Sequence, residues 1–239
     1  MSSVSFTFNK FEPNQEDLIL EGDASISKNN VLHLTSFDQN GLAQGGNVGR
    51  ALYAAPIHIF SNSALASSFE TTFTFKVSQN GSNAAGDGFA FFIAPTDTTI
   101  EPNSGGKFLG LFDGPSIITD KIIAVEFDTY PNSDIGDPEF VHIGIDINSI
   151  KSSVTSKWDL QSGVVATVKI SYNSLSKKLS VICSYPNAAP VTLTQEVDLS
   201  KALPEWVKVG FSASTGVHAQ ANDILSWSFR STLTTNNFV

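Results

Sequence analysis

The chain has 239 residues, which is long for an average domain but ordinary for a single all-β sandwich. Its formal net charge is −9 and it has no cluster of Lys and Arg, which argues against a nucleic-acid partner because phosphate backbones need a cationic surface. The one cysteine excludes an intrachain disulfide framework, and no apolar stretch reaches the length of a membrane-spanning helix. We therefore expect neither a nucleic-acid nor a membrane partner.

Short runs of alternating hydrophobicity recur along the chain and predict strands. The abundance of Phe, Ser, Thr, Val and Ile favours strands over helices. In chain order, the predicted strands cover 5–11, 23–28, 31–36, 68–77, 87–95, 122–130, 140–149, 164–172, 178–185, 191–197, 207–214 and 224–233. Alternation within 68–77 places Phe69, Thr71, Phe73 and Phe75 on one face.

Other segments are few. The helix-like pieces are single turns such as 198–206, and no linker or repeat divides the chain, so we predict one domain over 1–239. Cys183 lies within a predicted strand and is expected to be buried and inert. Trp158, Trp206 and Trp227 are expected in the core or at sheet edges. Four loops are rich in functional residue types: 80–88, 101–108, 129–140 and 214–223.

The segment 126–142 carries the sharpest chemical signal. Glu126 and Asp128 lie two residues apart on a predicted strand, so their carboxylates project from the same face. Two like charges side by side on a sheet are destabilising unless a cation lies between them. The turn that follows doubles the chain back and brings Asp137 and His142 towards the same place. The pattern predicts a metal site, although a solvated acidic turn with a structural histidine is the alternative.

Two ligand sets can be assembled from this segment. A mixed oxygen and nitrogen set suits Mn²⁺ or another transition ion: Glu126, Asp128, Asp137 and His142. An all-oxygen set suits Ca²⁺: Asp128, the Tyr130 carbonyl, the Asn132 amide oxygen and Asp137. Asp128 and Asp137 would bridge both ions.

At this point the sequence resembles the legume lectins, in particular the concanavalin A-like, mannose/glucose-binding type. The segments that carry the resemblance follow the family order over nearly the whole chain: 49–59, 86–95, 105–112, 124–150, 203–216 and 224–233. The resemblance implies a jelly-roll β-sandwich with a flat back sheet and a curved front sheet. It also implies one Mn²⁺ and one Ca²⁺, held by the two sets above, with Ser152 holding a metal-bound water.

The resemblance further implies a shallow sugar site. The family's sugar-binding positions fall on Asp87, Gly106, Tyr130, Asn132, Val217 and His218, with Lys107 able to reach a hydroxyl. In this family a cis peptide usually joins Ala to the binding-site Asp, whereas here Gly86 precedes Asp87. The short loop 214–223 predicts mannose/glucose over galactose. His218 could equally be an exposed loop residue without a role.

Several alternatives stay open. The chain could be a galactose- or fucose-type lectin, or a lectin-like storage or defence protein that has lost sugar binding. A jelly-roll glycoside hydrolase would need a Glu-x-Asp-x-Glu strand, but Tyr130 stands at the third position. We therefore expect no enzymatic activity.

The resemblance also implies assembly and location. A homodimer or homotetramer is expected, with 3–8 as the edge strand of the back sheet. The family implies a plant secretory-pathway protein, stored in vacuoles or protein bodies or secreted, although the N-terminus of this chain lacks the features of a signal peptide. Asn80 opens a glycosylation sequon.

Overall fold

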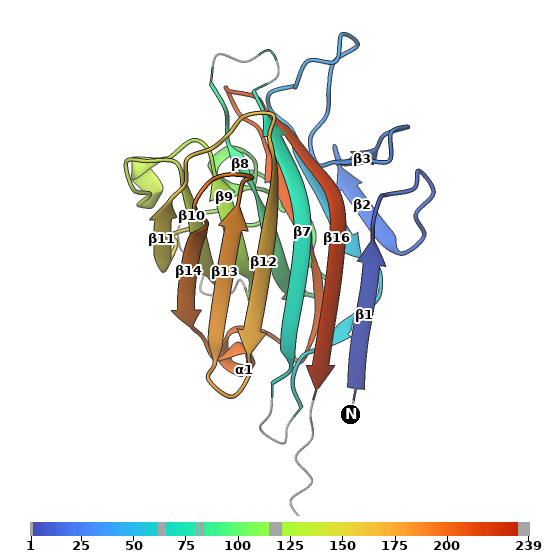
Figure 1. Cartoon of the computed structure of the whole chain (residues 1–239), viewed down its shortest axis with the longest axis vertical. Coiled ribbons are helices and arrows are strands. Elements are labelled where there is room, and N and C mark those ends of the chain that lie inside the picture. Colours follow the sequence, from blue (N-terminus) through green and yellow to red (C-terminus); the bar gives the residue numbers. More distant parts are fainter. Residues whose placement is uncertain (1, 62–65, 80, 82–83, 115–120, 234–239) are drawn as a thin grey trace, which may run out of the picture.

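The computed structural model describes residues 2–61, 66–79, 81, 84–114 and 121–233. These residues form a nearly all-β sandwich of two antiparallel sheets, which confirms the predicted fold (Figure 1). The described helices are a single α-turn, α1 (Leu199–Ala202), and two 3₁₀ turns, η1 (Gly106–Phe108) and η2 (Ser133–Ile135). None of the helices in the described ranges is long and apolar enough to cross a membrane.

The back sheet faces the viewer in Figure 1. Its strands run in the order β14 (Val191–Glu196), β13 (Lys178–Ser184), β12 (Val165–Asn173), β7 (Ser68–Ser78), β16 (Ala221–Leu233), β4 (Leu32–His33) and β3 (Ser25–Ile26). The segment β1 (Ser2–Phe8) pairs with the C-terminal half of β16 at the sheet edge, as expected. Alternation along β7 buries Phe69, Thr71, Phe73 and Phe75 on the inner face.

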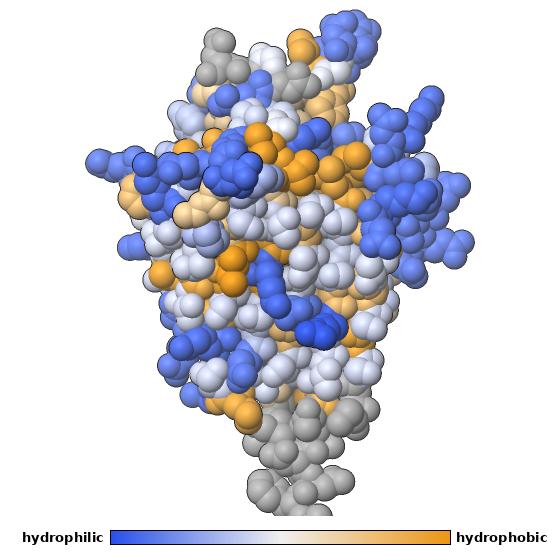
Figure 2. Space-filling model, in the orientation of Figure 1, coloured by the Kyte–Doolittle hydropathy of each residue, from blue (hydrophilic) through white to orange (hydrophobic). Residues whose placement is uncertain are grey.

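The outer face of the back sheet is polar without being strongly charged. Figure 2 shows it mostly in pale colours, crossed by one hydrophilic stripe. Ser and Thr side chains such as Thr72 and Ser228 face outward, and Glu70 forms ion pairs with Lys169 at 2.8 Å and with Arg230 at 3.2 Å.

The front sheet packs behind the back sheet and carries the candidate site. Its strands run in the order β11 (Val154–Lys157), β10 (His142–Ile147), β9 (Ile123–Asp128), β8 (Gly88–Pro95), β15 (Trp206–Ser214), β5 (Val48–Tyr53) and β2 (Leu18–Gly22), while β6 (Ile57–His58) pairs with β15. Strands β8 and β9 are buried on both faces, because the segment 104–112 covers the sheet from outside.

Aromatic side chains fill the space between the sheets. Phe89 and Phe127 stack with ring centroids 4.6 Å apart, and Phe73 packs edge-on to Phe211 at 4.9 Å. Each fully buried Phe stabilises the fold by roughly 1.5–3 kcal/mol. Trp227 lies in this core and donates to Thr71 Oγ1 at 2.9 Å.

The remaining expectations can now be compared with the fold. Cys183 and Trp158 are buried, as predicted, whereas Trp206 is 49% exposed on β15 and stacks on His58. The helix-like segment 198–206 forms only the single turn α1. Alternating hydrophobicity does not reveal four of the strands, β2, β5, β6 and β11.

The missed strand β5 has a physical explanation. It carries Arg50 at a fully buried position, where apolar residues would normally signal a strand. The guanidinium is held by Glu21 at 2.9 Å and lies over the Phe92 ring, 4.9 Å from its centroid.

Candidate metal centre and ligand-binding loops

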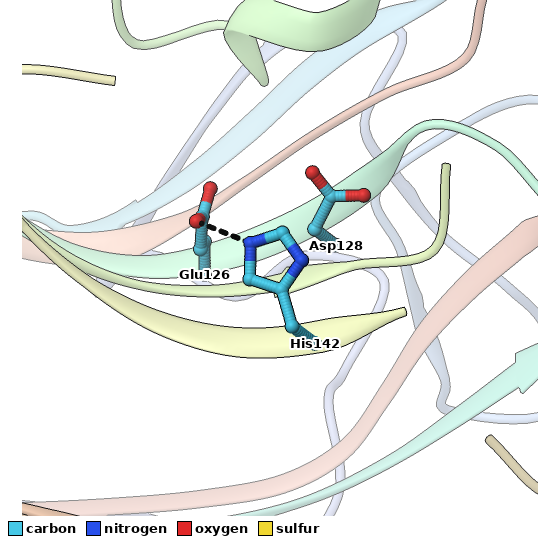
Figure 3. A group of neighbouring side chains, drawn as sticks. All are labelled: Glu126, Asp128 and His142. Atoms are coloured by element: carbon cyan, nitrogen blue, oxygen red, sulfur yellow. Dashed lines mark hydrogen bonds and ion pairs between the residues drawn. The ribbon is translucent and has the colours of Figure 1, made fainter. Parts of the chain in front are cut away.

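Two neighbouring front-sheet strands bring three ligand-type side chains together. Glu126 and Asp128 lie on β9, and His142 on β10 is directly opposite Asp128 in the register. All three side chains are buried, and their ligand atoms lie within 4.8 Å of one another. Figure 3 shows the side chains pointing toward one another from the two strands. The arrangement joins three of the four residues of the predicted mixed set.

The imidazole of His142 is oriented by its second nitrogen. Its Nδ1 lies 3.1 Å from the Phe140 carbonyl oxygen, and its Nε2 lies 3.1 Å from Glu126 Oε1. A backbone carbonyl can only accept, so Nδ1 carries the proton and donates it to Phe140. This leaves Nε2 facing the carboxylates, as in metal-binding histidines whose tautomer is fixed by an outer hydrogen bond.

Burial makes the cluster electrostatically unfavourable without a cation. Desolvation, together with the charge of Glu126, raises the pKa of Asp128 to about 8, against a smaller lowering by His142. Desolvation also raises the pKa of Asp137. Burial alone would lower the pKa of His142, but its hydrogen bond to Glu126 and the nearby carboxylates raise it overall. Burial and the neighbouring charges together make it unfavourable to ionise these carboxylates at the same time without a cation.

A fourth acid, Asp146, lies beside the cluster and was missed in the sequence. It is fully buried on β10, and desolvation raises its pKa well above the ordinary value. The Ser152 hydroxyl lies 2.5 Å from Glu126 Oε1 and 2.6 Å from Asp146 Oδ1, so Ser152 joins the two acids. Alternation on β10 puts Asp146 on the same face as His142, which was the signal that could have revealed it.

Glycine makes room for this contact. Gly144 lies opposite Glu126 in the register of β9 and β10. A Cβ on Gly144 would lie 2.0 Å from Ser152 Oγ and 2.6 Å from Glu126 Oε1. Only glycine therefore lets Ser152 approach Glu126.

The turn after β9 supplies the oxygen-rich part of the site. The Tyr130 N–H donates to Asp128 Oδ1 at 2.7 Å, and the Asn132 N–H donates to Asp137 Oδ2 at 2.6 Å. Among the described residues, the buried Asn132 Oδ1 has no hydrogen-bond partner. A buried amide oxygen without a donor, on a turn whose backbone is held by two carboxylates, fits the all-oxygen ligand set of Ca²⁺. The neighbouring acids and His142 fit Mn²⁺.

A second set of loops surrounds the carboxylate of Asp87. The Gly86–Asp87 peptide is cis, and Asp87 lies immediately before β8. A Cβ on Gly106 would lie 3.9 Å from both Asp87 carboxylate oxygens, and one on Gly216 would lie 2.9 Å from Oδ2. Three loops distant in sequence therefore meet at one carboxylate.

Asp87 is prepared to receive hydrogen bonds. No described residue donates to its buried Oδ2. Desolvation raises the pKa of Asp87 to about 6, partly offset by His218. A partly buried carboxylate with a free acceptor can take hydrogen bonds from two adjacent hydroxyl groups of a ligand.

Hydrogen bonds hold these loops in place, and their donors were not foreseen in the sequence. The Asp87 N–H donates to the Ser214 carbonyl at 3.1 Å, and the Ser214 hydroxyl donates to the Gly106 carbonyl at 2.5 Å. The Thr129 N–H donates to the Asp87 carbonyl at 2.9 Å, and the buried Gln220 side chain lies 2.6 Å from Thr129 Oγ1. These contacts link residues far apart in the chain, so no local pattern signals them.

The loop after β15 closes the site. Val217 is 98% exposed, whereas the His218 ring packs against the Tyr130 ring with centroids 4.9 Å apart. The Gly216 N–H donates to the His218 carbonyl at 3.2 Å. Lys107 forms an ion pair with Asp134, so its ammonium group is already engaged. The predicted sequon at Asn80 lies outside the described residues.

The predicted residues therefore gather in two adjoining places. Glu126, Asp128 and His142 form one cluster, and Ser152 contacts Glu126. Asp137 interacts with Asp128, and Tyr130 and Asn132 lie on the turn that follows β9. Gly106 faces the Asp87 carboxylate, and Tyr130 lies next to both Gly86 and His218.

Comparisons with known proteins agree with this geometry. Residues 3–238 match the legume lectin domain. A lectin from Leucomphalos mildbraedii is 55% identical over 97% of both chains, and a mannose/glucose-specific lectin from Centrolobium tomentosum is 43% identical over 97% of this chain and 96% of its own. The solved structure of lectin II from Ulex europaeus superposes with a TM-score of 0.89 at 44% identity, covering 96% of this chain and 99% of that one.

A family match over almost the whole length, close relatives and a shared fold all point the same way. Legume lectins bind carbohydrates and generally hold Ca²⁺ and Mn²⁺, and the acidic cluster with His142 is a potential metal site of that kind. The chain belongs to the legume lectin family.

Proposed function

We propose that this chain is a metal-dependent lectin that binds a terminal mannose or glucose residue through Asp87 and does not transform it. The observation that supports this most is the Asp87 carboxylate, which lies against the backbone of Gly106 and Gly216 with Oδ2 free of any described donor. A pyranose presents adjacent hydroxyl groups, and such a carboxylate can accept a hydrogen bond from each.

Each surrounding group has a part in holding the sugar. Gly106 offers a backbone N–H without a side chain to block close approach. The Asn132 amide can donate from its nitrogen while its oxygen faces the acidic turn. The Tyr130 ring is 40% exposed and can cover the apolar face of a pyranose. Val217 and His218 would close the site.

The metal centre would act on the site indirectly. When bound, Ca²⁺ and Mn²⁺ would supply the positive charge that lets Glu126, Asp128 and Asp137 be ionised together at neutral pH. Asp128 and Asp137 already accept from the backbone of Tyr130 and Asn132, so their charge state determines how firmly this turn is held. Asn132 then stands at a fixed position beside the sugar.

Hydrolysis is the weaker reading. A glycosidase needs two carboxyl groups on either side of the scissile bond. Glu126 and Asp128 are instead buried together beside a histidine, and the Asp87 carboxylate lies against the backbone of Gly106 and Gly216.

Specificity is a proposal drawn from the loop after β15. The loop is short and Val217 projects from it, features that we associate with mannose or glucose. The Centrolobium tomentosum relative carries that specificity in its name. Against this, a winged bean acidic lectin of the same fold was solved with methyl α-D-galactose, and lectin I from Ulex europaeus with a methyl fucoside. A galactose- or fucose-type lectin is therefore the second candidate.

Calorimetric titration of the Ca²⁺- and Mn²⁺-loaded protein tests the proposal. Methyl α-mannoside should bind with a Kd on the order of millimolar to high micromolar, and methyl α-galactoside at least tenfold more weakly. The reverse order would overturn the specificity. No measurable binding of the mannoside, the galactoside or the fucoside would indicate a storage or defence protein that has lost sugar binding.

Such weak sites would gain strength through assembly. We propose a homodimer or homotetramer formed through the back sheet, whose outer face is mostly of intermediate hydropathy (Figure 2) and presents Ser and Thr side chains such as Thr72 and Ser228. Several sites on one particle add roughly 10²–10⁴ in avidity. Sedimentation of the protein would test the assembly. We also propose a place in the plant secretory pathway, in vacuoles, in protein bodies or outside the cell, which localisation of the protein in its source tissue would test.

A further inference from the structure

A hollow of about 520 Å³ lies next to the sugar-binding loops, on the side of the segment that follows β11. Its lining includes Gln79, Ala85, Tyr130, Lys157, Asp159 and Leu160. The volume falls within the roughly 300–1,000 Å³ that ligand clefts occupy.

The hollow and the proposed monosaccharide site share the Tyr130 side chain and the segment that leads to Asp87. Tyr130 lines the hollow and also packs against His218, and its Cβ lies 3.4 Å from where a Cβ on Gly86 would be. Ala85, two residues before Asp87, forms another part of the wall. A ligand held at Asp87 that extends past the Tyr130 ring would therefore reach the hollow.

The chemistry of the lining is divided. Ala85, Leu160 and the buried Trp158 give the hollow an apolar part. Lys157 and Asp159 provide a charged rim. A pyranose ring has the same division, with an apolar face and a polar edge of hydroxyl groups.

The rim charges are available to a ligand. Lys157 Nζ and Asp159 Oδ1 lie 3.3 Å apart, with side chains 68% and 87% exposed. Such an exposed pair contributes little to stability, so both groups can turn to new partners at small cost. Lys157 would donate to a hydroxyl oxygen, and Asp159 would accept from a hydroxyl group.

We propose that this hollow is a subsite for the second pyranose residue of a glycan whose terminal residue is bound at Asp87. The proposal rests on the proposed function, because it requires a sugar at Asp87. It assigns the rim residues Lys157 and Asp159, and the apolar Leu160, to the second ring only.

The test compares monosaccharides with disaccharides on the intact, metal-loaded protein. The probes are methyl α-mannoside against the α1,2-, α1,3- and α1,6-linked mannobiosides, with methyl β-galactoside against lactose as the second series. One variant pair, Lys157→Ala with Asp159→Ala, removes the rim, and a separate Leu160→Trp fills the hollow. The matched control is Lys10→Ala with Glu12→Ala, which removes an exposed ion pair of 2.8 Å from the loop after β1.

At least one disaccharide should bind the wild-type chain fivefold or more tighter than the matching methyl glycoside. Both hollow variants should reduce that gain to less than twofold, with monosaccharide binding unchanged, while the control keeps the gain. A wild-type chain that gains nothing from any disaccharide, or a gain that survives in both hollow variants, would overturn the subsite alone. If no monosaccharide binds, the proposed function fails first.

An apolar aglycone is the competing occupant. Nitrophenyl α-mannoside should gain less than the best disaccharide and should be insensitive to loss of Lys157 and Asp159. A gain as large as that of the disaccharide, with the disaccharide also insensitive to loss of the rim, would assign the hollow to apolar groups and overturn the proposal.

Discussion

The hydroxyl of Ser214 donates to the carbonyl oxygen of Gly106 over 2.5 Å. Through its own carbonyl, Ser214 also accepts from the Asp87 N–H at 3.1 Å. One residue at the end of β15 thus fixes the spacing between the two loops that would hold the sugar. Ser212, two residues earlier on the same face, makes the equivalent bond to the Leu109 carbonyl, also over 2.5 Å, but does not reach Asp87.

Removal of these two hydroxyl groups should have different effects. Ser214→Ala is expected to weaken binding of methyl α-mannoside about tenfold, because Gly106 can move relative to Asp87. Both substitutions should lower the free energy of unfolding by about 1–3 kcal/mol, because each leaves a buried or partly buried carbonyl without its donor. Ser212→Ala should nevertheless leave the affinity for methyl α-mannoside within twofold of the wild-type value. Calorimetric titration and thermal unfolding of both variants check this, and equal affinities would refute a positioning role for Ser214.

Gly144→Ala should impair the metal centre. Its Cβ would lie 2.0 Å from Ser152 Oγ and 2.6 Å from Glu126 Oε1, so Ser152 or Glu126 must move. Metal affinity is expected to fall about 10- to 100-fold, as for losses among the partners that orient metal ligands. The control is Gly114→Ala, because no described atom lies within 4 Å of a Cβ there. Equal Mn²⁺ affinities in equilibrium dialysis would contradict the crowding argument.

The metal-free protein should lose stability as the pH rises from about 4 to about 8. The pKa of Asp128 is about 8 in the folded chain, mainly through desolvation and the charge of Glu126, and lies near 3.8 without these effects. Within this window the folded state binds more protons than the unfolded state, so the free energy of unfolding falls with rising pH. The raised pKa of His142 acts in the same direction above about 6.5.

Denaturant unfolding at several pH values, with and without Ca²⁺ and Mn²⁺, measures this effect. Asp128→Asn should flatten the metal-free profile, because the side chain no longer titrates. Added metal should stabilise the protein more at pH 7.5 than at pH 5, since protons compete for the ligands at low pH. If the free energy of unfolding of the metal-free protein rose steadily between pH 5 and pH 8, this cluster would not be the main source of its pH dependence.

Sugar binding should weaken below pH 6 even when metal is saturating. Desolvation raises the pKa of Asp87 to about 6 in the free protein. Only the ionised carboxylate can accept hydrogen bonds from two hydroxyl groups of the sugar. At one pH unit below its pKa, about a tenth of the carboxylate is ionised, so affinity should fall about tenfold. Titrations at pH 5 and pH 7 check this, with metal occupancy measured in parallel. A constant affinity at constant occupancy would mean that Asp87 does not carry the interaction.

Much of the metal centre could be predicted from local pattern. Alternation on a strand puts Glu126 and Asp128 on one face, and the structure finds their ligand atoms within 4.8 Å of His142. The same alternation would have placed Asp146 beside His142, but an acid within a strand reads as a solvated residue until its neighbours are known. Whether Asp146 is buried depends on the strand register and on the contact that Ser152 makes with it, and neither can be seen in the local sequence.

The ligand loops were harder to predict because their residues are distant in the chain. No spacing rule indicates that Gly106 and Gly216 both lie against Asp87; Gly106 was predicted only through the family resemblance, and Gly216 was not predicted. Ser214 and Gln220 were missed because their roles depend on pairing between β8 and β15 and on buried contacts behind the site. The strand β5 was not predicted because the charged Arg50 occupies a buried position and interrupts the apolar pattern.

The most direct test of the account is whether sugar binding depends on the metal centre. Methyl α-mannoside is titrated into the protein loaded with Ca²⁺ and Mn²⁺, then after stripping with a chelator at mildly acidic pH and return to neutral pH, and again after both ions are restored. Binding should disappear on stripping and return with the ions. Binding of equal affinity in the stripped protein would contradict the role given to Asp128, Asp137 and Asn132, whatever the fold.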